Sequence, residues 1–111
     1  MNDSILNTIK QMLGITVEQT EFDTDIIVHI NSVLNILHQL GGCTDWIQIT
    51  GPSEEWSLIS ENIEKCNMIK TWMYQKVKLL FDPPLNSTVI SAMERQISEF
   101  EFRILENHND K

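Results

Sequence analysis

Histidine and cysteine are the side chains of this sequence best suited to hold a metal ion, and they are few. His29 and His38 are nine residues apart, and at about 100° per residue a helix directs them to opposite sides. Cys43 and Cys66 are too far apart for a CxxC motif, so we interpret both as reduced thiols that pack in a core. His108 falls near the end of the chain. The sequence therefore predicts no metal site.

Carboxylates could serve as a general acid and base, and Asp23 and Asp25 are a candidate pair. They stand directly before a segment with helical periodicity, where carboxylates favour a helix N-terminus, so we interpret Asp23 as an N-cap. The sequence contains neither GxGxxG nor GxxxxGK[ST], and it offers no elbow for a nucleophile. We expect no enzymatic activity, no catalytic residue and no cofactor.

A basic stripe is the third candidate for chemistry. Lys70, Tyr74 and Lys78 follow one another at steps of four, which places them on one face of a helix. Such a face could bind DNA or an acidic partner. The chain, however, carries a net charge of -8 over 111 residues, the wrong sign for a protein that holds phosphate backbones. A solvated helix face is the simpler interpretation.

The acidic charge is unevenly distributed. Residues 1–64 contain one base, Lys10, and ten acids, whereas residues 65–111 contain seven bases and six acids. Opposite charge on two parts of one chain could pair identical subunits head to tail, an arrangement that produces rings or filaments. This electrostatic pairing is a hypothesis that the charge pattern alone suggests.

The elements that carry these residues are predicted to be helices. Apolar residues recur at helical spacing, which predicts an all-α fold: a small bundle of three main helices plus a short N-terminal helix. We expect a short helix over about 3–13, a helix over about 24–40, a loop over 41–52 with room for one short strand, helices over about 54–81 and 87–106, and a frayed tail over 107–111. One domain would cover residues 1–111.

Helix ends are marked by residues with known preferences. Starts are predicted at Asp3, Asp23, Ser53, and either Asn86 or Ser87. Gly14 and Gly41 suit the position after a helix end. Pro83 and Pro84 lack a backbone donor, so a helix must stop before them.

No apolar stretch is long enough to cross a membrane, since a spanning helix needs about 18 or more such residues. The first residues also lack the pattern of a secretory signal. We expect a soluble protein of the cell interior with no membrane contact.

The expected loop before the third helix is unusually apolar. Trp46, Ile47 and Ile49 are more hydrophobic than a connection of this length requires. They could dock a partner, or they could fold back onto the core of their own chain. Both interpretations stay open.

Two stretches together resemble the small head-to-tail connector, or adaptor, proteins of tailed bacteriophages and prophages. The first is Glu21-Phe22-Asp23-Thr24-Asp25-Ile26-Ile27 with His29-Ile30-Asn31-Ser32-Val33 and Gln39-Leu40-Gly41. The second is Lys76-Val77-Lys78-Leu79-Leu80-Phe81-Asp82-Pro83-Pro84, followed by Met93, Arg95-Gln96-Ile97 and Glu99-Phe100-Glu101-Phe102-Arg103-Ile104. In order and spacing these stretches cover most of the chain. Phe102 stands where the family pattern suggests Trp.

The resemblance implies a helical subunit that assembles as a ring of twelve copies beneath the portal vertex, once the head is filled with DNA. One side of the ring would meet the portal protein, the other would receive a stopper or tail-completion protein, and DNA would pass through without specific binding. The protein would be made in the bacterial cytoplasm, could remain monomeric alone, and would belong to the virion at the head-tail junction.

Two sets of residues are candidates for this role. Those expected to contact partners or ring neighbours are Trp46, Ile47, Ile49, Lys70, Tyr74, Lys78, Phe81, Asp82, Pro83, Pro84, Arg95 and Arg103. Acids in connecting segments that could face the channel and repel DNA are Glu18, Glu21, Asp45, Glu54 and Glu55. The alternatives are a small helical DNA-binding packaging or regulatory protein, or a generic helical interaction module; salt-sensitive duplex binding would indicate the first of these.

Overall fold

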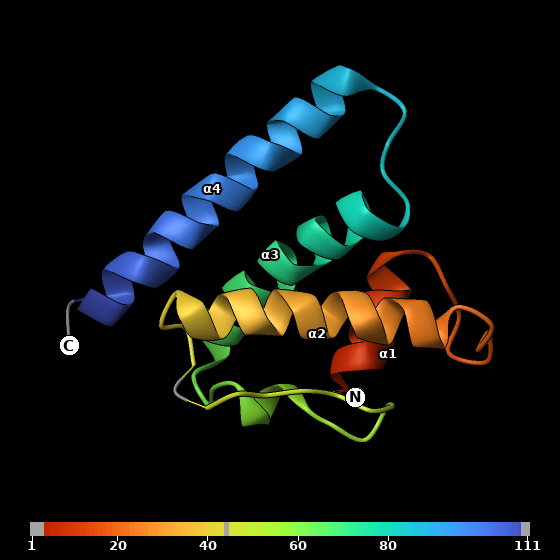
Figure 1. The fold of residues 1–111 in the computed structure, drawn as a ribbon, viewed down its shortest axis with the longest axis horizontal. Coiled ribbons are helices and arrows are strands. Elements are labelled where there is room, and N and C mark those ends of the chain that lie inside the picture. Colours follow the sequence, from red (N-terminus) through yellow and green to blue (C-terminus); the bar gives the residue numbers. More distant parts are fainter. Residues whose placement is uncertain (1–3, 44, 110–111) are drawn as a thin grey trace.

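The computed structural model describes residues 4–43 and 45–109, with side chains described as far as residue 106. These residues form α1 (Ile5–Met12), α2 (Asp23–Gln39), a short 3-10 turn η1 (Trp56–Leu58), α3 (Ile63–Phe81) and α4 (Ser87–Asn109) (Figure 1). No β-strand occurs among them, so the expected short strand is absent from that part of the chain. The prediction of an all-α fold is confirmed.

Two regions can be distinguished. Helices α1, α2 and α3 pack on one another, and together with the described residues of the segments 13–22 and 40–62 they form what we call the body. Helix α4 packs chiefly on α3, and its N-terminal half stands clear of α1 and α2 (Figure 1). We call α4 and the preceding turn, residues 82–86, the arm.

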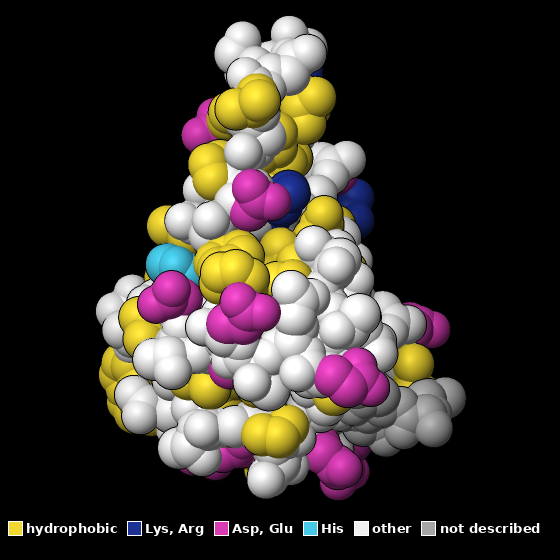
Figure 2. All heavy atoms as spheres, turned by 90° about the vertical axis from the view of Figure 1, so that its right-hand side faces the viewer, with side chains coloured by type: hydrophobic (Ala, Val, Ile, Leu, Met, Phe, Trp, Pro, Cys, Tyr) yellow, Lys and Arg dark blue, Asp and Glu magenta, His cyan; other side chains and the backbone are white. Residues whose placement is uncertain are grey.

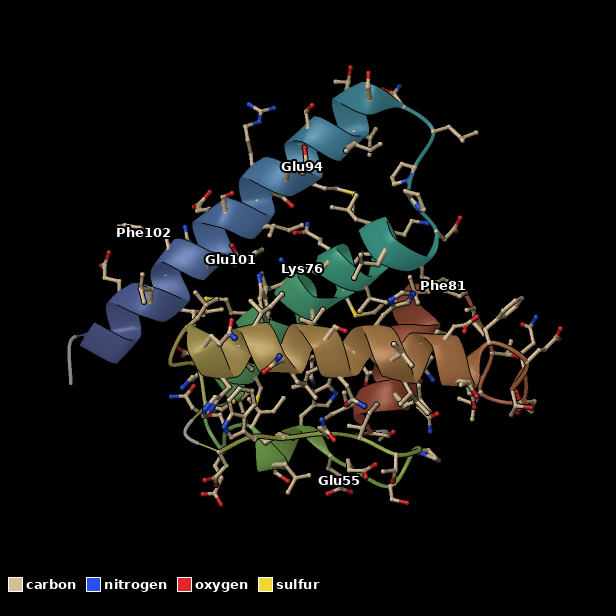
Figure 3. All side chains as sticks on the ribbon, viewed as in Figure 1. Glu55, Lys76, Phe81, Glu94, Glu101 and Phe102 are labelled. Carbon is tan, nitrogen blue, oxygen red and sulfur yellow. The ribbon has the colours of Figure 1, made fainter. Side chains whose placement is uncertain are left out.

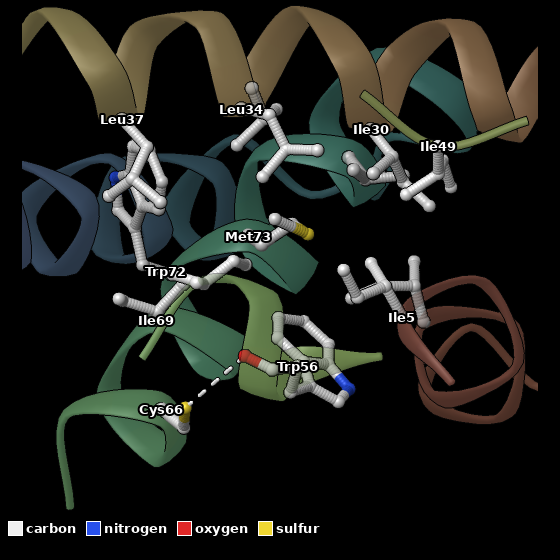
Figure 4. Packing of buried hydrophobic residues seen from close by; sticks show 14 of the residues in the cluster. Ile5, Ile30, Leu34, Leu37, Ile49, Trp56, Cys66, Ile69, Trp72 and Met73 are labelled. Carbon is white, nitrogen blue, oxygen red and sulfur yellow. Dashed lines mark hydrogen bonds between the residues drawn. The ribbon is translucent and has the colours of Figure 1, made fainter. Parts of the chain in front are cut away.

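The hydrophobic core lies almost entirely within the body (Figure 4). Its largest fully buried side chain is Trp72 of α3. From α4, Ile97 and Ile104 are the buried side chains among the described residues. Further core residues are Ile5, Leu6, Ile9, Ile26, Ile30, Val33, Leu34, Leu37, Ile49, Trp56, Ile69, Met73 and Val77.

The start of α2 differs from its prediction. Phe22 occupies the N-cap position without a side-chain cap, and Asp23 is the first helical residue. The Asp23 carboxylate lies 2.8 Å from the Lys10 ammonium, whose side chain is 1% exposed. Lys10 also donates a hydrogen bond to the carbonyl of Val17 at 3.1 Å. The N-cap prediction for Asp23 is wrong because this buried cation engages its carboxylate.

The first helix, Ile5–Met12, lies within the predicted range of about 3–13. Ser4 is its N-cap and accepts a hydrogen bond from the Asn7 backbone at 3.2 Å. The predicted cap, Asp3, lies outside the described residues.

The predicted helix over 54–81 is in fact two elements. Residues before η1 are held extended, because the Ile5 amide donates to the Glu54 carbonyl at 3.0 Å and Ser4 forms an antiparallel bridge with Glu55. The buried Trp56 donates from Nε1 to Thr8 Oγ1 at 3.0 Å. Helix α3 starts later, where Asn62 accepts from the Lys65 amide. Ser53 therefore starts no helix, because the two residues that follow it form backbone contacts with Ser4 and Ile5.

The remaining helix ends follow the sequence closely. Gly14 and Gly41 both adopt φ of +84°, as expected after a helix end. Helix α3 stops at Phe81, directly before Asp82 and the two prolines. Asn86 caps α4 through a 2.8 Å hydrogen bond to the Thr88 amide. Helix α4 extends to Asn109, beyond the predicted end at about residue 106. The fraying of the tail stays a prediction.

Candidate functional site

The loop that carries Trp46 is fixed to α2 by one amide side chain. Asn31 accepts a hydrogen bond from the Ile49 amide at 2.7 Å and donates one to the Ile49 carbonyl at 3.0 Å. Ile49 is 1% exposed and packs in the core, so its side chain is not available at the surface. Trp46 remains 65% exposed and rests on His38, with 4.0 Å between ring centroids. The loop thus presents an exposed aromatic on an ordered backbone.

A shallow groove of about 520 Å³ runs beside Trp46. It is lined by Val28, Asn31, Ser32, Asn35, Trp46, Ile47 and Gln48. None of these residues carries a charge, so the groove, which we call the loop groove, is uncharged and combines apolar side chains with amide and hydroxyl groups. Trp46 and Ile47, both expected to contact partners, lie in it.

A second groove, of about 540 Å³, lies where α2 begins and α3 ends, and we call it the aromatic groove. Its lining consists of Leu13, Ile15, Phe22, Asp25, His29, Leu80, Phe81 and Asp82. Phe81 packs edge-on against Phe22, with 5.6 Å between centroids, and against His29 at 6.4 Å. Two residues expected to contact partners, Phe81 and Asp82, are therefore brought together with apolar side chains of the segment that joins α1 to α2, namely Leu13, Ile15 and Phe22.

The turn between α3 and α4 is apolar as well. Leu80 and Leu85 are both exposed, as is Val89 in the first turn of α4. Pro83 and Pro84 lie between them in the sequence. Figure 2 shows hydrophobic side chains gathered on the narrow upper part of the molecule.

The side of α4 that turns away from α3 carries a second set of exposed residues. Its members recur at helical spacing and are Ser91, Arg95, Ser98, Phe102 and Leu105, which we call the outer stripe. Phe102 is 64% exposed and points away from the body (Figure 3). Arg103, on the neighbouring face, pairs with Glu99. Arg95 has no ion pair among the described residues.

The lysine stripe of α3 does not form a free basic face. Lys70 lies over the Trp56 ring, 5.4 Å from its centroid, and Tyr74 is partly buried against the core. Lys78 pairs with Asp82 at 3.1 Å. Because each of these side chains is engaged within the chain, the stripe offers less positive charge to DNA than the sequence suggests.

The candidate channel acids lie on the surface of the body. Glu18, Glu21, Asp45 and Glu55 are exposed. Glu54 is partly buried, which raises the pKa of its carboxyl, but hydrogen bonds from the Thr50 hydroxyl and backbone outweigh burial and lower that pKa overall.

The surface charge does not follow the division into body and arm, because four lysines lie on α3 of the body and the arm has more acids than bases. Figure 2 shows most Asp and Glu side chains over the broad lower part of the molecule and the Lys and Arg side chains on the narrow upper part. Since the one base of residues 1–64, Lys10, is buried and paired with Asp23, it leaves no positive charge on this acidic surface.

The cysteines are packed in the body. Cys66 Sγ donates to the Ser60 carbonyl at 3.0 Å, and Cys43 Sγ donates to the Asp45 carbonyl at 3.4 Å. Burial raises the pKa of both thiols. Among the described residues, no group of three or more His, Cys, Asp and Glu side chains is placed to hold a metal ion, and no helix is long and apolar enough to cross a membrane.

Phe22, His29, Leu80 and Phe102 were not expected from the sequence to contact partners. Phe22 offered a weak signal, an aromatic in an otherwise acidic segment. Phe102 offered another, because it lies outside the periodic apolar seam of its helix.

A family model described as phage connector protein matches residues 5–111. No curated protein and no solved structure matches the chain.

Proposed function

The chain belongs to the phage connector protein family, and from this membership we propose that it is the head-to-tail connector of a tailed phage or prophage. The match over residues 5–111 is the observation that carries the proposal. In the proposed role, one connector domain assembles as a ring of twelve copies under the portal. The ring joins the DNA-filled head to a stopper or tail protein at the head-tail junction of the virion.

Exposed apolar surfaces support a role in assembly. Monomeric proteins rarely leave large apolar patches uncovered, and exposed aromatic side chains commonly anchor protein interfaces. Here Trp46 is exposed on the body and Phe102 on the arm. The loop groove and the exposed side chains of Leu85 and Val89 provide two separate surfaces, one for the portal and one for the tail side.

The acidity of the body supports passage of DNA without binding. Carboxylates that face a channel repel phosphates and remove the counterion release that drives non-specific binding. In the proposed ring, Glu18, Glu21, Asp45, Glu54 and Glu55 line the channel. The engagement of Lys70 and Lys78 within the chain agrees with this assignment.

The test is to mix the purified chain with DNA-filled, tailless heads of the phage that encodes it and to image the portal vertex. We expect an added ring of density below the portal. Vertices without added density, at saturating protein, would overturn the proposal.

A second measurement addresses the DNA-binding alternative. Duplex DNA should show no salt-dependent binding to the free chain at low ionic strength. A steep loss of affinity with rising salt would instead support a DNA-binding packaging or regulatory protein.

A further inference from the structure

We infer that neighbouring copies of this chain join by seating the outer stripe of α4 from one copy in the aromatic groove of the next. This contact rests on the proposed function, because a ring requires an interface between copies. It assigns that interface to two specific surfaces that the sequence does not connect.

The aromatic groove has an apolar floor and acidic edges. Phe22, Phe81 and Leu80 supply apolar surface, and Leu80 remains 55% exposed. Asp25 lies in the first turn of α2 and Asp82 directly follows α3, so two carboxylates border the groove. Asp82 is already paired with Lys78, so Asp25, which has no ion pair among the described residues, is the carboxylate open to a cation from another copy. A matching occupant therefore needs an apolar side chain and a cation close to it.

The outer stripe has this composition. Phe102 and Leu105 are exposed apolar side chains, and Arg95 lies seven residues before Phe102 on the same stripe. At about 1.5 Å per residue, the Arg95 and Phe102 backbones are about 10 Å apart along the helix. Arg95 has no ion pair among the described residues, whereas Glu99 is engaged by Arg103. A guanidinium can bind a carboxylate through two parallel hydrogen bonds, which adds direction to the contact.

The loop groove is a poorer receptor for the same stripe. Val28, Trp46 and Ile47 provide apolar surface there, but no charged residue lines the groove. Burying Arg95 against it would leave the cation without a partner. Charge complementarity thus selects the aromatic groove for the neighbouring copy.

The positions of the two surfaces favour a ring. Phe81 and Phe102 lie on opposite sides of the molecule (Figure 3). Contact between two different patches is heterologous, so each copy keeps one free stripe and one free groove for the next copy. Repetition of one such contact closes a ring when the rotation between copies divides a full turn.

Disulfide trapping tests the contact directly. Chains carrying Leu80→Cys are mixed with differently tagged chains carrying Phe102→Cys under mild oxidation; the native thiols are buried and stay out of the exchange. We expect the mixed dimer to form at least about tenfold faster than either homodimer, because the contact raises the effective concentration of the pair. Equal rates, or faster homodimers, would overturn the inference.

Two controls accompany the trapping experiment. Ser57→Cys, on the exposed surface of η1, replaces Leu80→Cys and reports the collision rate between unrelated surfaces. Circular dichroism of each single variant verifies that it is folded. A mixed rate no higher than with Ser57→Cys would also overturn the inference.

A charge swap tests the role of Arg95. Arg95→Glu in the Phe102→Cys chain should lower the trapping rate about tenfold, and Asp25→Arg in the Leu80→Cys chain should restore it. Lys65→Glu makes the same change of charge on another surface and should have little effect. If Arg95→Glu acts no more strongly than Lys65→Glu, or if the swap fails to restore trapping, the inference is wrong.

The proposed function can fail separately. If a ring is imaged at the vertex but copies carrying Leu80→Cys and Phe102→Cys form no disulfide with each other, this inference is overturned and the connector role stays in place. If no ring is imaged, the connector role is overturned. The trapping rates in solution would still show whether the outer stripe of one copy contacts the aromatic groove of another.

Discussion

The body and the arm bury their apolar residues to very different degrees. In the body, side chains from α1, α2 and α3 share one core around Trp72. In the arm, the 23-residue helix α4 buries Ile97 and Ile104, and Phe102 and Leu105 remain exposed. The body is thus stabilised by a core of its own, whereas the arm has no separate core and contributes few buried side chains to that of the body.

The joint between the two regions combines apolar and polar contacts. Glu101 of α4 accepts hydrogen bonds from Trp72 Nε1 at 3.2 Å and from Lys76 Nζ at 3.1 Å. Gln75 donates to Gln96 in the same interface. These polar contacts give the arm a defined position on α3 with little burial.

The largest loss of stability is expected for a substitution at the centre of the body. Trp72→Ala removes a fully buried side chain and its hydrogen bond to Glu101, and we expect a loss of about 3–5 kcal/mol in the free energy of unfolding. Phe102→Ala, the matched aromatic substitution in the arm, should change it by less than about 0.5 kcal/mol. Urea denaturation followed by circular dichroism measures both. Similar losses for the two variants would show that the body and the arm do not differ in this way.

The buried ion pair is the next test of the body. Lys10→Ala leaves Asp23 without its cation, and Asp23 is 25% exposed. We expect a loss of about 2–3 kcal/mol, below the range for fully buried pairs because water reaches the carboxylate. Lys10→Met retains the packing of the aliphatic stem, so comparison of the two variants in urea separates packing from charge. An unfolding free energy unchanged in Lys10→Ala would mean that the pair contributes nothing to the body.

Stability should fall when a single methyl group is added at Gly42, where the body meets the arm. A Cβ at Gly42 would lie 2.2 Å from Leu37 Cδ1 and 3.1 Å from Ile104 Cγ2. Gly42→Ala should therefore cost about 1–3 kcal/mol through overpacking. Gly51 has open space around the same position, so Gly51→Ala is the control and should cost less. Thermal unfolding compares the two, and equal melting temperatures would contradict the close packing at Gly42.

Local chemistry explains why the helices themselves could be predicted from the sequence. The apolar spacing of α2 and α4, the prolines after Asp82, and the glycines at 14 and 41 act through neighbours in the chain. The errors arose where a distant residue decided the outcome. The carboxylate of Asp23 pairs with Lys10 instead of capping α2. The residues after Ser53 are held extended by a hydrogen bond to the first residue of α1.

The candidate site was predictable only in part for the same reason. Trp46, Phe81 and Asp82 stood out by type or by their place in a motif, and all three lie at grooves. The partners of Phe81 in the aromatic groove, Phe22 and His29, come from another helix region, so no spacing rule in the sequence links them.

Trp46→Ala should have the smallest effect on stability but a clear effect on assembly. Trp46 is exposed and rests on His38, while the backbone of its loop is held by the hydrogen bonds of Asn31 to Ile49. Trp46→Ala should therefore change the free energy of unfolding by no more than about 0.5 kcal/mol, yet weaken attachment to portal-bearing heads, because exposed aromatics anchor interfaces.

Leu58→Ala, an equally apolar change at another exposed site of the body, is the control for attachment. Occupancy of vertices in electron micrographs measures attachment, and urea denaturation measures stability. If Trp46→Ala instead unfolds the chain while heads still bind the folded fraction, Trp46 belongs to the stability of the body. The loop groove would then offer no anchor, and contacts with partners would fall to the arm and the aromatic groove.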